Sequence, residues 1–69
     1  MTATLDITPY EDQAGELRYR YQAEIGEITE IGQCDDGYQV SAIIQELRDK
    51  AERKGYYLQV NQLPIEVRH

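Results

Sequence analysis

The sequence predicts a single α+β domain in which one amphipathic helix packs on one face of a small, mostly antiparallel sheet. Residues 17–25 alternate strictly between apolar or aromatic side chains and polar ones, as in a half-buried strand. Residues 40–51 instead carry apolar side chains at helical spacing. Because strand-like runs flank this helix, we expect three N-terminal strands, the helix and one or two C-terminal strands within residues 1–69.

The first expected strand lies near the N-terminus, where Ala3, Leu5 and Ile7 alternate with polar residues. Pro9 lacks a backbone donor, so it is expected to end this strand or to place it at a sheet edge. Residues 11–16 are polar and include a glycine, which is typical of a loop.

The second and third strands are expected to form a hairpin. Gly26-Glu27 matches a two-residue type II′ turn between them. A simple two-residue turn would place Glu30 on the core face and Ile31 on the solvent face. We therefore expect either a bulge near Thr29, which would reverse the alternation, or a longer turn.

The helix is expected over residues 39–54. Asp36, with Gln39 three residues later, is suited to capping its start, and Gly55 is suited to ending it. Residues 56–60 and 63–67 then alternate again as strands. Pro64 confines the last of these to a sheet edge or to an extended tail.

The predicted core combines the apolar faces of the second strand, the helix and the strand after it. Its members are Leu17, Tyr19, Tyr21, Ile25, Ile43, Ile44, Leu47 and Leu58. The arginines that alternate with these tyrosines are expected on the opposite face of the strand. The tyrosines and arginines therefore cannot contact one nucleic acid together.

The chain has 13 acidic and 7 basic residues, for a net charge of −6, and this charge is unevenly placed. Residues 1–37 hold nine acidic and two basic residues, a balance of −7. Such a chain repels nucleic acid and anionic lipid, so we expect no direct nucleic-acid or membrane binding. No signal peptide or membrane span is visible, and the single cysteine fits a reducing, cytoplasmic setting.

The common catalytic sets are missing from the sequence. One cysteine and one histidine exclude a disulfide and a Cys/His zinc site within one chain, and no glycine-rich phosphate loop is present. Cys34 is followed by Asp35 and Asp36, whose charge raises a thiol pKa and lowers its reactivity. We expect no enzymatic activity, no cofactor and no metal.

Two functional hypotheses follow. The first is a non-enzymatic protein-interaction module, such as a regulatory or accessory subunit, that uses exposed tyrosine and C-terminal strand residues. The second is an acidic inhibitor that mimics nucleic acid and blocks a basic binding protein. The candidate partner-binding residues are Tyr57, Leu63, Ile65 and Val67 for the first hypothesis, and Glu27, Glu30, Asp35 and Asp36 for the second.

The small size of the domain and its C-terminal apolar run also favour a homodimer. The two alternating runs at residues 56–68 carry more apolar side chains than the core of so small a domain can bury. Exposed apolar strand edges tend to pair with other chains. The competing interpretation is a monomer whose tail folds back over its own sheet or frays.

Overall fold

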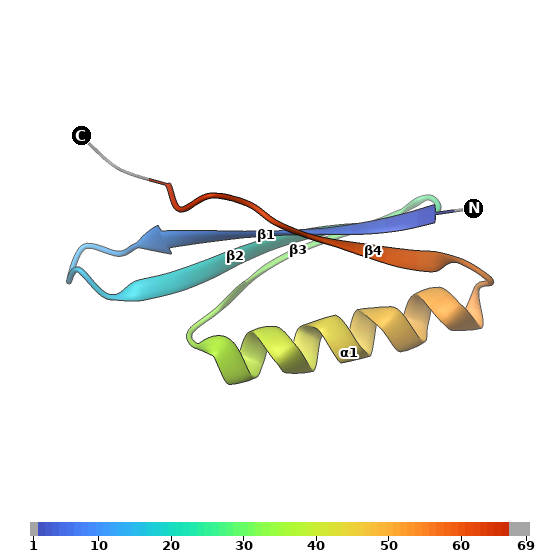
Figure 1. Ribbon diagram of the computed structural model, residues 1–69. Coiled ribbons are helices and arrows are strands. Elements are labelled where there is room, and N and C mark those ends of the chain that lie inside the picture. Colours follow the sequence, from blue (N-terminus) through green and yellow to red (C-terminus); the bar gives the residue numbers. More distant parts are fainter. Residues whose placement is uncertain (1, 67–69) are drawn as a thin grey trace.

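The computed structural model describes residues 2–66 and confirms the predicted order of elements. Three strands come first, followed by the helix and one further strand (Figure 1). Their bounds are β1 Thr2–Glu11, β2 Leu17–Ile25, β3 Ile28–Cys34, α1 Gly37–Arg53 and β4 Tyr57–Gln62. No helix in this described part of the chain is both long and apolar enough to cross a membrane.

The four strands form one mixed sheet in the order β3-β2-β1-β4. β1 pairs antiparallel with β2, and β2 pairs antiparallel with β3, as expected for consecutive hairpins. β4, however, lies parallel to β1, with Thr2 opposite Tyr57. The parallel pair arises because α1 carries the chain from the β3 edge across the sheet to the other edge, so that β4 runs in the same direction as β3.

The core lies between the sheet and α1, which covers one face only (Figure 1). The predicted members Ile25, Leu47 and Leu58 are buried, and the two tyrosines and two isoleucines are half-buried against them. The prediction for Leu17 is wrong: its side chain is 46% exposed, because it lies at the very start of β2, opposite Glu11 at the end of β1. The central positions belong instead to β1, through Ala3, Leu5 and Ile7.

Pro9 does not end β1, and β1 is not an edge strand. The N–H and C=O of a strand residue point to the same side, and successive residues alternate. The carbonyls of Ile7 and Pro9 both accept bonds from the chain after β4, at Leu63 and Glu66. The missing donor of Pro9 therefore faces this side, where the regular β1–β4 pairing has already ended at Ile7–Gln62. The proline removes no bond from the β1–β2 pairing.

The β2–β3 hairpin has the predicted two-residue turn, with a left-handed φ of +62° at Gly26. Neither the expected bulge nor the alternative, a longer turn, is formed, because the strands pair one-to-one from Ile25–Ile28 onward. Glu30 therefore lies on the helix side of the sheet, and Ile31 lies on the opposite, uncovered side, which we call the open face. This register is tolerated because Lys50 of α1 reaches the Glu30 carboxylate at 3.0 Å.

Both ends of α1 are capped as the sequence predicts, although the helix starts two residues earlier. The Asp36 side chain accepts a hydrogen bond from the Gln39 N–H at 2.9 Å, and Gln39 Oε1 accepts one from the Asp35 N–H at 2.8 Å. At the other end Gly55 adopts a left-handed φ of +80°. The N–H groups of Gly55 and Tyr56 then bond back to the last turn, which is a Schellman ending.

Candidate functional site

The two edges of the sheet differ in chemistry. The β3 edge carries the charged side chain of Glu30, which points to the helix side and is bound there by Lys50. An inward-pointing charge is one device by which natural edge strands resist pairing with other chains. Glu27 adds a second acidic group at the turn before this strand. The β3 edge is therefore protected against another strand.

The other edge of the sheet, formed by β4, lacks this protection. Its residues, Tyr57 to Gln62, include no charged side chain and no proline. The Leu63 N–H bonds to Ile7 of β1, so the odd-numbered residues of β4 direct their backbone groups inward to β1. The N–H and C=O groups of Leu58, Val60 and Gln62 consequently point away from the sheet. They form a row of donors and acceptors ready for another strand.

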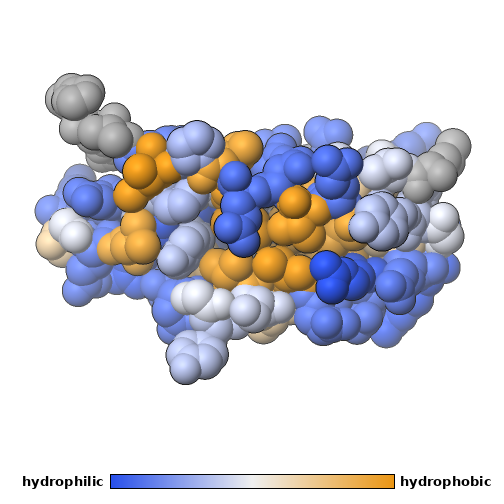
Figure 2. All heavy atoms as spheres, viewed as in Figure 1, coloured by the Kyte–Doolittle hydropathy of each residue, from blue (hydrophilic) through white to orange (hydrophobic). Residues whose placement is uncertain are grey.

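Exposed apolar side chains accompany this row. Tyr57 is 76% exposed, and Leu63 and Ile65 are 41% and 46% exposed. Figure 2 shows hydrophobic residues gathered along the line where this edge meets the helix, and again toward the end of the chain. We call the outer side of β4, with Leu63 and Ile65, the β4 edge. Three of the four residues predicted for partner binding thus lie along this edge, with Tyr57 at the start of β4 and Leu63 and Ile65 beyond its end. Val67 lies outside the described residues.

The segment after β4 folds back along its own sheet. The N–H groups of Leu63 and Glu66 bond to β1 carbonyls at 2.9 Å, and Glu66 also forms an isolated bridge with Tyr10. Pro64 lies between these two anchors at the sheet edge, as its missing donor requires. The apolar side chains on either side of it remain solvent-accessible, so folding back does not bury them.

The four acidic candidates do not form one surface. Glu27 lies at one end of β3, and Asp35 and Asp36 follow its other end. Glu30 is paired with Lys50, and Asp36 caps the helix. Within residues 2–66, no three acidic, cysteine or histidine side chains approach closely enough to hold a metal ion.

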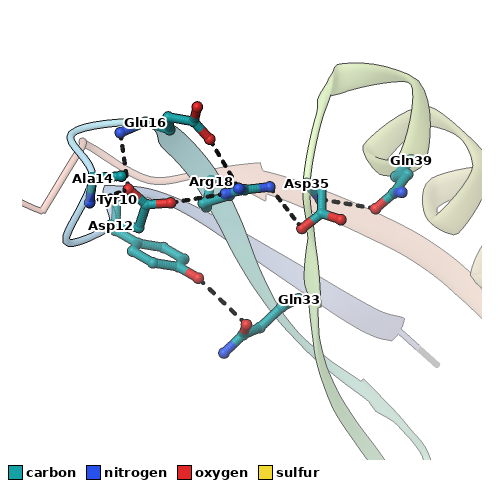
Figure 3. Close-up of polar contacts among 8 residues, drawn as sticks. All are labelled: Tyr10, Asp12, Ala14, Glu16, Arg18, Gln33, Asp35 and Gln39. Atoms are coloured by element: carbon teal, nitrogen blue, oxygen red, sulfur yellow. Dashed lines mark hydrogen bonds and ion pairs between the residues drawn. The ribbon is translucent and has the colours of Figure 1, made fainter.

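Asp35 belongs to a network around Arg18 (Figure 3). This guanidinium binds Asp12 at 3.0 Å, Glu16 at 2.9 Å and Asp35 at 3.0 Å, and so joins the β1–β2 loop to the segment before the helix. The Asp12 carboxylate also accepts the N–H groups of Ala14 and Glu16. The bond from Glu16 and the one from Arg18 hold the pKa of Asp12 below its usual value. The network is a structural clamp on the loop.

The thiol of Cys34 is unsuited to nucleophilic chemistry. It is buried at the end of β3. Burial raises the pKa of Cys34, and the neighbouring carboxylates of Asp35 and Asp36 raise it further. The sequence indicated the second cause but not the first.

Sequence reasoning missed a cluster on the open face. Arg20 lies with its guanidinium carbon 4.7 Å from the centre of the Tyr10 ring, and it binds Glu66 at 3.1 Å. Arg20 and Glu66, together with Ile31 and Leu63, border an open hollow of about 220 Å³. Alternation placed Arg20 on the correct face, but Tyr10 and Glu66 are supplied by β1 and the folded-back segment, which no local pattern links to it.

Comparison of the chain with protein-family models, with curated proteins and with solved structures finds no match.

Proposed function

We propose that this chain is a non-enzymatic protein-interaction module, a regulatory or accessory subunit, that binds its partner through the β4 edge. The observation that supports this most directly is the contrast between the two sheet edges. One edge carries an inward-pointing glutamate, whereas the other presents six uncharged residues and unpaired backbone groups beside Tyr57 and Leu63. Adding a strand to such an edge is a common way for proteins to recognise extended segments.

The engagement of the acidic residues makes nucleic-acid mimicry the weaker proposal. A mimic needs free carboxylates arranged along one surface, to replace phosphates in a basic groove. Here the carboxylates of Glu30 and Asp35 are bound to cations of the same chain, and that of Asp36 is used by the helix. We also propose a cytoplasmic setting, which suits a lone thiol without a disulfide partner.

Site-specific photo-crosslinking in cells tests the proposal. The photoreactive residue p-benzoylphenylalanine replaces Tyr57 on the β4 edge or, as a control, Tyr38, which is 90% exposed on the helix. We expect adducts from position 57 and none from position 38. An equal pattern from both positions, or no adduct from position 57, would contradict the use of this edge.

A matched pair of charge variants makes the test specific. Gln59→Lys places a charge on the open side of β4, where it opposes strand pairing. Thr29→Lys places the same charge on the open side of the β3 edge. We expect the adducts from position 57 to be lost with Gln59→Lys and retained with Thr29→Lys. Adducts that survive Gln59→Lys would show that binding does not depend on this strand.

A further inference from the structure

We infer that the β4 edge pairs with the β4 edge of a second copy of this chain, antiparallel and across a two-fold axis at Val60. This inference rests on the proposed function and names the partner. It follows from three properties of the edge: the direction of its backbone groups, the spacing of its exposed side chains and the placement of its charges.

The backbone of β4 is self-complementary about Val60. Leu58, Val60 and Gln62 direct their N–H and C=O groups outward, as derived above from the bond between Leu63 and Ile7. In an antiparallel pair, residues that face each other in this way exchange both bonds. A two-fold axis at Val60 pairs this residue with itself and Leu58 with the partner's Gln62. Every outward backbone group of β4 then has a partner.

The same register pairs the exposed side chains. It places Tyr57 opposite the partner's Leu63, and both lie on the open face, where they are 76% and 41% exposed. Aromatic and aliphatic side chains directly opposite each other stabilise antiparallel pairs. Gln59 falls opposite the partner's Asn61, so that amide faces amide. The register therefore matches apolar with apolar and polar with polar along the seam.

The charges select this edge for a partner of the same sequence. Two chains of net charge −6 repel each other, so they associate best where acidic residues are sparse. The β4 strand has none, and on the helix side it is bordered by Arg48 and Glu52, one helical turn apart, beside Tyr57 and Leu58. The two-fold axis places one such pair of opposite charges near each end of the seam. Pairing through β3 would instead bring an edge that carries Glu30 beside its own copy.

Disulfide trapping of the full chain tests the register. The hydrogen-bonded pair at the axis has its Cα atoms about 5.5 Å apart, within the range of about 4.4–6.8 Å for a disulfide. Val60→Cys is therefore expected to give a covalent dimer under mild oxidation. In Gln59→Cys the two cysteines are diagonal neighbours about 7–8 Å apart, so this variant serves as the matched control. The unsubstituted chain controls for Cys34, which is buried.

The result with these variants decides the matter. A covalent dimer from Val60→Cys, with little from Gln59→Cys, is expected. Preferential trapping of Gln59→Cys would overturn the register, and trapping of neither would overturn the dimer.

Sedimentation equilibrium from about 10 μM to about 1 mM measures the strength of the association. Tyr57→Ser removes the same cross-strand pair twice, so the dimer should weaken by roughly 2- to 30-fold. Added salt should strengthen the dimer, because it screens the repulsion between the two acidic chains. A chain that is monomeric throughout this range would overturn the inference. If position 57 nevertheless crosslinks to a different protein in cells, the proposed function stands without the dimer; if it crosslinks to nothing, both fall.

Discussion

Replacing Leu5 by alanine is expected to remove most of the stability of this domain, whereas the same change at Leu17 is expected to be mild. Leu5 is fully buried in the central strand β1, beneath the helix, whereas Leu17 is 46% exposed at the start of β2. A buried Leu→Ala change costs about 2–5 kcal/mol, and a 69-residue domain has about 3–10 kcal/mol in total. The Leu17→Ala change should cost about 1 kcal/mol or less.

Urea unfolding followed by circular dichroism at 25 °C measures the difference between the two variants. With a slope of about 1 kcal/mol per molar urea for a domain of this size, Leu5→Ala should lower the midpoint by about 2 M or more and shorten the folded baseline. Leu17→Ala should move it by about 1 M or less. Equal losses, or a larger loss at Leu17, would refute the placement of β1 at the centre of the sheet.

Three further predictions concern the loop clamp, the β2–β3 pairing and the helix cap. Asp12→Asn should lower the melting temperature at neutral pH, because the pKa of Asp12 is lowered in the fold and its charged carboxylate therefore stabilises the folded state. Well below pH 3.8 this carboxylate is protonated, so the variant and the unsubstituted chain should melt at similar temperatures. Melting curves against pH check this, and a difference that stays constant with pH would contradict it. Gly32→Ala should destabilise the sheet, since a Cβ there would lie 2.5 Å from the Tyr21 ring. In a double-mutant cycle, Tyr21→Ala should therefore cost less free energy of unfolding in the Gly32→Ala background than in the unsubstituted chain. Asp36→Ala should cost about 1 kcal/mol through the lost bond to the Gln39 N–H, and Asp36→Asn should largely restore it in urea unfolding.

The features that local chemistry determines could be predicted from the sequence. The alternation of residues 17–25, the turn at Gly26 and both caps of the helix depend on neighbours a few residues away. Two errors arose where a distant partner decides the outcome. Pro9 is tolerated because its missing donor faces the β4 side of β1, where the regular β1–β4 pairing has already ended. Glu30 is tolerated on the helix side because Lys50, 20 residues later, reaches it.

The candidate site was predicted in part for the same reason. The exposure of Tyr57, Leu63 and Ile65 follows from a terminal run with Pro64, which keeps it at an edge. The acidic residues were grouped because they are close in the sequence, but an extended strand separates Glu27 from Asp35. The difference between the two edges depends on strand order, which alternation alone does not give.

The parallel pairing of β1 with β4 also determines the order in which the chain can be completed during synthesis. β1 is made before β4, and residues as far apart as Thr2 and Tyr57 must meet before the sheet is closed. Contacts of such long sequence separation form slowly. A nascent chain that has produced only β1, β2 and β3 has an unpaired β1 side and a core without its helix, so it resembles an aggregation-prone folding intermediate. The side of β1 that faces β4 therefore stays unpaired until β4 has been synthesised and released.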